Sequence, residues 1–141
     1  MSKSRKILYG IAAFAVFALG VNVPGFIDAG KQKKAVEATF SAYSRALVSE
    51  DYAKAYELCG EEFKRTILLE SFVATQHETQ SNFGKLKTMD NADTYLHGKG
   101  SPMRWISVIE AHQVYEKGNV RLVCEFHLEN DSWKLFGCKQ V

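Results

Sequence analysis

The hydrophobic pattern of this chain changes its period at Gly84. Before this glycine, apolar residues recur every three or four positions, which is typical of amphipathic helices. After it, apolar and polar residues alternate, which is typical of strands that are buried on one face. Helices that precede an antiparallel sheet along the chain indicate an α+β fold. We therefore expect a single α+β domain over residues 31–141.

The segment before Gly84 predicts helices. A first helix has one apolar stripe, formed by Val36, Phe40, Tyr43 and Leu47. Asp51 is a good N-cap for a short second helix, and Gly60 is expected to end it. A further helix is expected over residues 68–83, with Gly84 as its C-terminal stop.

The segment after Gly84 predicts strands. They are expected at Lys85–Met89, Thr94–His97, Arg104–Lys117, Val120–Leu128 and Trp133–Gln140. Gly118-Asn119 is a typical two-residue hairpin loop, so we pair Lys117 with Val120. In this register the apolar side chains of the two strands share one face of the sheet.

The same register predicts a polar group on the other face. Glu110 would lie opposite His127, and His112 opposite Glu125. Two histidines and two glutamates could bind zinc or perform acid–base chemistry. Charge pairs on a solvated sheet face are the simpler interpretation, so we expect no metal site and no cofactor here.

The last hairpin decides whether Cys124 and Cys138 can meet. The apolar pattern favours a register in which Cys124 lies opposite Gly137 and Cys138 points to the other face. A register shifted by one residue would place the two cysteines opposite each other, and β-bulges produce such shifts. The sequence leaves both alternatives open. Cys59 is expected to be a small buried apolar residue.

The amino-terminal residues predict export. Lys3, Arg5 and Lys6 precede an apolar run over residues 7–23, which is the pattern of an export signal. As a helix the run would span ~25 Å, slightly less than a hydrocarbon core of ~30 Å. We favour an uncleaved signal anchor that holds the domain at the inner membrane, in the periplasm or outside the cell. Cleavage after Gly20 would instead give a secreted protein, and in both cases residues 1–30 lie outside the domain.

Composition and charge exclude several classes. The chain has 141 residues, of which 46% are hydrophobic and 24% charged, so it is not disordered. Three of the 18 basic and one of the 16 acidic residues lie within residues 1–30, which leaves 15 of each in the body. A neutral body argues against nucleic acid as a partner. No catalytic motif with a known spacing occurs in the sequence.

The order of elements resembles a known superfamily. The residues that carry the resemblance are Asp51-Tyr52 and Ala55-Tyr56 in the short helix, Phe83-Gly84-Lys85, and the final strand around residues 131–135. They resemble the nuclear transport factor 2-like superfamily, and within it the small exported bacterial domains of unknown function. The resemblance covers roughly residues 33–140. It implies a cone of three helices packed on a curved antiparallel sheet, with a cavity at the wide end.

The resemblance also bears on function. The superfamily includes isomerases and dehydratases, whose catalytic sets match no residues here, and binding modules that dimerise through the exposed sheet face. We expect an exported, membrane-tethered, non-catalytic domain for a small apolar ligand or an envelope protein, with a homodimer through the sheet face as a further option. The alternatives are a cavity enzyme of isomerase or dehydratase type and a structural subunit of an envelope secretion or conjugation assembly. The candidate pocket residues are Phe40, Tyr43, Trp105, Ile109, Tyr115 and Phe126.

Overall fold

The computed structural model describes residues 29–99 and 104–141. The predicted apolar helix over residues 7–23 lies outside the described residues. Residues 33–141 form one compact unit. Within the described part of the chain, no helix combines the length and the apolar character needed to span a membrane.

The helices come first along the chain. A long helix over residues 29–48 is followed by α2 (Tyr52–Glu57), α3 (Glu61–Thr66) and α4 (Leu69–Phe83). The apolar stripe predicted for the long helix is confirmed, because all four of its residues are buried. The Asp51 cap is also confirmed, since its carboxylate accepts a hydrogen bond from the Lys54 backbone N–H at 3.3 Å.

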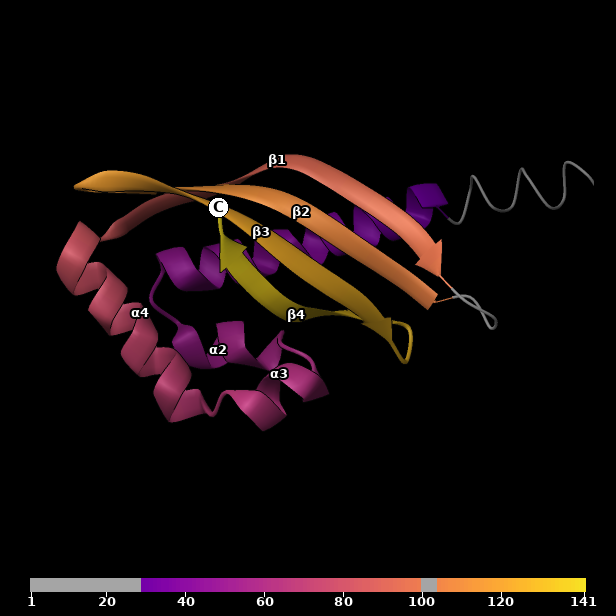
Figure 1. Cartoon of the computed structure of the whole chain (residues 1–141), viewed down its shortest axis with the longest axis horizontal. Coiled ribbons are helices and arrows are strands. Elements are labelled where there is room, and N and C mark those ends of the chain that lie inside the picture. Colours follow the sequence, from indigo (N-terminus) through magenta and orange to yellow (C-terminus); the bar gives the residue numbers. More distant parts are fainter. Residues whose placement is uncertain (1–28, 100–103) are drawn as a thin grey trace, which may run out of the picture. The chain divides into compact units, whose positions relative to one another are not determined.

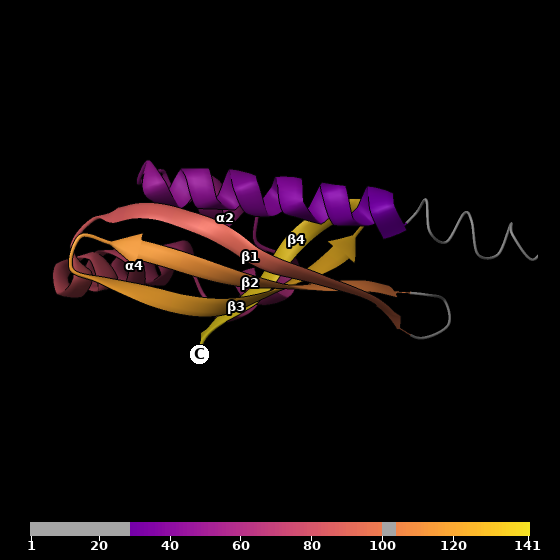
Figure 2. The same ribbon diagram turned by 90° about the horizontal axis from the view of Figure 1, so that it is seen from above.

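The strands follow and form one antiparallel sheet in the order β1-β2-β3-β4. They are β1 (Leu86–Lys99), β2 (Arg104–Tyr115), β3 (Gly118–Glu129) and β4 (Ser132–Gln140). Two strands predicted separately, at residues 85–89 and 94–97, are one strand with an irregularity between Asn91 and Asp93. The Asn91 amide donates hydrogen bonds to the Glu37 carboxylate at 3.3 Å and to the Thr94 hydroxyl at 2.6 Å. The bond to Glu37 joins β1 to the long helix, which lies alongside this strand in Figure 2.

The predicted cone of three helices is wrong, whereas the α+β fold with an antiparallel sheet is confirmed. The described residues form four helices, which lie on one side of the sheet (Figure 1). Gly60 was expected to end the second helix, but its extended backbone begins α3 instead. The reason is pairing with β4: the Gly60 N–H donates to the Leu135 carbonyl, and the Leu135 N–H donates to the Leu58 carbonyl. This contact separates α2 from α3, a short helix that the sequence pattern did not predict.

The predicted register of β2 and β3 is also wrong. Val120 pairs with Gln113 instead of Lys117, so the hairpin loop is Glu116-Lys117 and not Gly118-Asn119. The shift is an even number of residues, which leaves every side chain on its predicted face. The inward-facing Ile109, Ala111, Cys124 and Phe126 are accordingly buried.

The last hairpin contains both registers that the sequence left open. Leu128 pairs with Trp133 in the register that the apolar pattern favours, and a bulge then places Cys124 opposite Cys138. The two cysteines form a disulfide. Phe136 is the extra residue of the bulge, because Leu135 and Gly137 pair with consecutive residues of β3.

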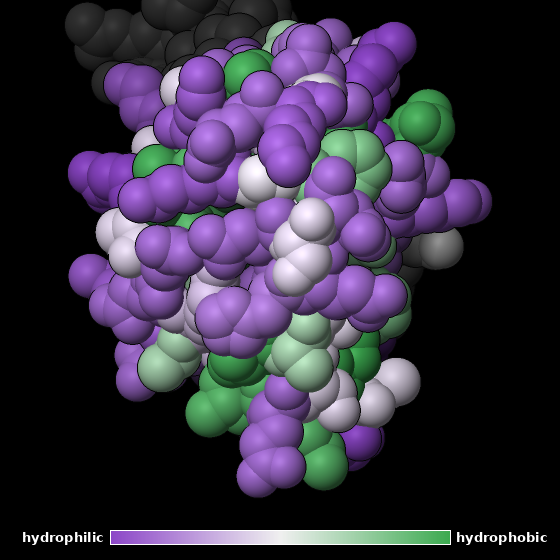
Figure 3. Space-filling model, turned by 90° about the vertical axis from the view of Figure 1, so that its left-hand side faces the viewer, coloured by the Kyte–Doolittle hydropathy of each residue, from purple (hydrophilic) through white to green (hydrophobic). Residues whose placement is uncertain are grey.

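The surface of this unit is largely polar on the side of α4 (Figure 3). Apolar side chains gather at the lower end of this view, over the start of α4, where Leu68 is 64% exposed. The core lies between the helices and the inner face of the sheet. Its most deeply buried large side chains are Phe126, Ile109, Leu135 and Val36.

Candidate functional site

A pocket of about 210 Å³ lies between α4, the long helix and the inner face of the sheet. α4 contributes Gln76, Thr79 and Phe83 to its wall, and the long helix contributes Tyr43 and Leu47. The remaining lining residues come from β2, β3 and the end of β4. We call this space the Tyr43 pocket.

Buried polar side chains form part of the Tyr43 pocket. Tyr43, Gln113 and Tyr115 are 4%, 5% and 7% exposed, although each has polar atoms. The Tyr115 hydroxyl donates to the Gln113 side-chain carbonyl at 3.1 Å. The Gln113 amide nitrogen donates in turn to the Met89 sulfur at 3.5 Å, which is a weak acceptor. Two of the three buried side chains are therefore held in place by each other and by the core.

Tyr43 differs from the other two. No described residue forms a hydrogen bond with its hydroxyl, which is open to the pocket although the side chain as a whole is only 4% exposed. Burial raises the pKa of Tyr43, and the neighbouring Cys59 and Tyr115 raise it further. The hydroxyl therefore keeps its proton at physiological pH and can donate a hydrogen bond to a molecule in the pocket.

The Tyr43 pocket carries no charge. None of the described residues that line it is Asp, Glu, Lys, Arg or His. Its tyrosines are neutral, since burial also raises the pKa of Tyr115, with a smaller contribution from Tyr52. The pocket thus offers hydrogen bonds and apolar contact but no ion pair.

The structure separates the predicted pocket residues into three groups. Tyr43 and Tyr115 line the pocket. Phe40, Ile109 and Phe126 are core residues, and the rings of Phe40 and Phe126 pack edge to face with centroids 6.4 Å apart.

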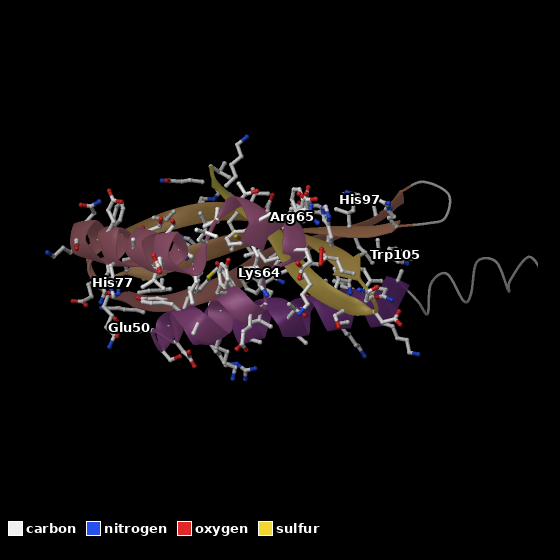
Figure 4. All side chains as sticks on the ribbon, turned by 90° about the horizontal axis from the view of Figure 1, so that it is seen from below. Glu50, Lys64, Arg65, His77, His97 and Trp105 are labelled. Carbon is white, nitrogen blue, oxygen red and sulfur yellow. A yellow bond between two sulfur atoms is a disulfide. The ribbon has the colours of Figure 1, made fainter. Side chains whose placement is uncertain are left out.

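Trp105 lies elsewhere in the unit. It is half-buried at the end of the sheet far from Glu50 and His77, as Figure 4 shows. There it borders a separate depression of about 490 Å³ together with Arg104 and His127.

Sequence reasoning missed the polar members of the pocket. It selected aromatic residues only, and so omitted Gln113, Gln76 and Thr79. For Gln113 a signal was present, because it occupies an inward-facing position between Ala111 and Tyr115. A glutamine at such a position is a buried polar group that needs a partner.

The predicted polar group on the outer face is only partly assembled. His127 lies 2.8 Å from the Glu125 carboxylate on the same strand, and its ring stacks on Phe136 at 4.1 Å. The expected cross-strand pairs do not form, because His112 faces Arg121 and Glu110 faces Val123. In the described part of the chain, no cluster of His, Cys, Asp and Glu could hold a metal ion.

Two further depressions differ from the Tyr43 pocket in their lining. One of about 380 Å³ lies beside Glu110, His112 and Arg121. None of the polar side chains that line it, or that line the depression at Trp105, is buried. Exposed charges of this kind are solvated, so they give no sign of a missing ligand.

Comparison with known proteins indicates the fold alone. No family model matches the chain, and neither does any curated protein. Among solved structures, the chain is similar to the structure of Bdellovibrio bacteriovorus Bd1075, with a TM-score of 0.58 and 12% sequence identity. The match covers 79% of this chain and 40% of that chain. The resemblance to the nuclear transport factor 2-like superfamily therefore stays a prediction.

Proposed function

We propose that this chain is an exported, membrane-tethered, non-catalytic domain that binds a small ligand in the Tyr43 pocket. The observation that carries the proposal is Tyr43, a side chain only 4% exposed that lines the pocket and forms no hydrogen bond with another described residue. Its hydroxyl is not among the fully buried atoms without a partner in the described part of the chain, so it is open to the pocket. A bound molecule with an acceptor atom can take its hydrogen bond.

Two features support export. The basic residues and apolar run at the amino terminus have the pattern of a signal anchor. The Cys124–Cys138 disulfide fits an oxidising compartment, since thiols of cytosolic proteins are kept reduced. We propose that residues 7–23 hold the domain at the inner membrane, in the periplasm or outside the cell.

A cavity enzyme of isomerase or dehydratase type has less support. Such an enzyme needs an ionisable side chain inside the pocket with a pKa suited to proton transfer. Glu110 and His112 lie on the outer face of the sheet, away from the Tyr43 pocket. The raised pKa of the pocket tyrosines keeps both protonated at neutral pH, so neither supplies a phenolate base.

The experiment is a native mass spectrum of the full chain, purified from membranes and held in nanodiscs. A small bound mass, lost in a Thr79→Trp variant that fills the pocket from α4, is the expected result. Thr75→Trp is the matched control, because Thr75 is exposed one turn earlier on the same helix.

The other outcomes decide between the alternatives. A bare monomer would contradict a ligand that copurifies with the chain. A second copy would favour a homodimer through the sheet face. An envelope protein bound at fixed stoichiometry would favour a structural subunit of an assembly. A bound mass that also survives in Thr79→Trp would place the ligand outside the Tyr43 pocket.

A further inference from the structure

We infer that the Tyr43 pocket selects an uncharged ligand, a single ring that carries a hydrogen-bond acceptor such as a carbonyl group. This inference rests on the proposed function and adds the chemical class of the ligand. It is carried by three properties of the pocket: its lack of charge, its free hydroxyl donor and its size.

The lack of charge excludes ions. A carboxylate or ammonium group that enters the pocket would lose part of its hydration. None of the described lining residues could compensate with an opposite charge. Apolar side chains of the long helix, α4 and β3 also line the pocket, among them Leu47, Phe83, Val120 and Leu122. A neutral ring can pack against these walls without such a desolvation penalty.

The hydrogen-bonding groups define the polar part of the ligand. The Tyr43 hydroxyl is a donor at the pocket wall that forms no hydrogen bond with a described residue, so a ligand with an acceptor can bond to it. The Tyr115 hydroxyl uses its O–H to donate a hydrogen bond to Gln113, which leaves a lone pair on its oxygen. A ligand N–H beside the carbonyl group could bond to this lone pair. A primary amide on a ring presents both groups together.

The volume sets the size of the ligand. An apolar cavity of ~150 Å³ is large enough for benzene. The Tyr43 pocket has about 210 Å³, which leaves space for one ring and one small polar substituent.

The test uses three probes of one shape and different charge: benzamide, benzoate and benzamidine. Each is titrated into the full chain in nanodiscs and followed by ligand-detected nuclear magnetic resonance, which is sensitive to a Kd of ~1 mM. We expect benzamide to bind. Benzoate and benzamidine should bind at least tenfold more weakly, because their charge has no counter-charge in the pocket.

Two variants locate the probe. Tyr43→Phe removes the donor and keeps the ring, so we expect about tenfold weaker benzamide binding, as for the loss of one hydrogen bond. Tyr95→Phe is the matched control, since Tyr95 is exposed on the outer face of the sheet and should leave binding unchanged. Thr79→Trp should abolish binding even if Tyr43→Phe alters the fold.

The outcomes separate the inference from the proposed function. Equal binding of benzoate or benzamidine, or benzamide binding that Tyr43→Phe leaves unchanged, would overturn the inferred class of ligand. If binding is still blocked by Thr79→Trp, the proposed function survives. If no probe binds while the native mass spectrum shows a ligand, the inference alone fails. If no probe binds and the spectrum shows a bare chain, both proposals fail.

Discussion

At the scale of single residues, Cys59 is a thiol enclosed by the core. It is 1% exposed, and its sulfur lies 3.6 Å from the Ala55 carbonyl oxygen. Burial raises its pKa from 9.0 to about 12, while Lys64 and Lys134 act in the opposite direction. The thiolate form is therefore far less favourable in the folded chain than in the unfolded chain.

This raised pKa predicts a loss of stability in alkali. A thiol whose pKa rises on folding stabilises the protein below its unfolded pKa, and the contribution is lost as the pH rises toward the folded value. Between about pH 8 and about pH 11, Cys59 should account for a loss of ~2–3 kcal/mol. We expect the unfolding free energy of the natural chain to fall more steeply than that of Cys59→Ala, measured in urea across this range. If the unfolding free energies of the two proteins fall with pH in parallel, the prediction is contradicted. The raised pKa of Tyr43 also lowers stability in alkali, but it does so equally in both proteins and therefore produces no difference between them.

The sequence predicts part of the pocket at this scale. Helical spacing placed Tyr43 on the buried stripe, and strand alternation placed Tyr115 on the inner face. The free hydroxyl of Tyr43 was not predictable, because it depends on which side chains of α4 and β2 come within bonding distance. Trp105 was grouped with these residues only because strand alternation places it on the same face of the sheet. It lies too far along its strand to reach them.

At the scale of elements, the β2–β3 loop shows why the pairing register of two strands is harder to predict than the face of the sheet on which each side chain lies. Gly118-Asn119 has the better loop sequence, yet the loop forms at Glu116-Lys117. The Glu116 N–H donates to the Lys85 carbonyl at 3.0 Å, and the Lys117 N–H donates to the Phe83 carbonyl at 2.8 Å. These bonds connect the loop to the end of α4 and the start of β1. A contact between distant segments thus overrides the local turn preference.

Removal of the Glu116 carboxylate should weaken this connection. Its side-chain oxygen accepts a hydrogen bond from the Lys85 backbone N–H at 3.0 Å. We expect Glu116→Ala to lower the unfolding free energy by about 1 kcal/mol, as measured by urea denaturation. The neighbouring Lys117→Ala is the control and should change it little, since Lys117 is exposed and contributes its backbone N–H. Equal effects of the two variants would show that the carboxylate has no specific role.

The β3–β4 loop offers a change in the opposite direction. Asn130 and Asp131 both have positive φ, 47° and 64°, which favours glycine at the second position of such a turn. Asp131→Gly should therefore raise the midpoint of thermal unfolding, with a gain of about 0.5 kcal/mol. Asn119→Gly is the opposite control, because Asn119 lies within β3 at negative φ and should lose stability. A lower midpoint of thermal unfolding for Asp131→Gly would mean that the Asp131 side chain stabilises the loop by more than the relief of its positive φ does.

At the scale of the whole molecule, periodicity was sufficient for the α+β order but not for the arrangement of the helices. The change of period at Gly84 coincides with the end of α4, where φ is 81°. α3 was missed because six residues are too few for a period to be recognised. The bulge at Phe136, which decides the disulfide, leaves no mark in the apolar pattern.

The disulfide connects the fold to the compartment in which we propose that it acts. Cys124 and Cys138 are separated by 14 positions, and closing a loop of about 15 residues stabilises a protein by about 3 kcal/mol. We expect the double variant Cys124→Ala and Cys138→Ala to lose about this much in urea denaturation, and reduction of the natural chain to give the same midpoint. Cys138 and Gln140 also line the Tyr43 pocket, so benzamide binding should weaken on reduction as the end of β4 loosens. In Cys59→Ala, which keeps the disulfide, binding should still respond to reductant. Unchanged stability after reduction would show that strand pairing alone holds β4, and the disulfide would then lend no support to export.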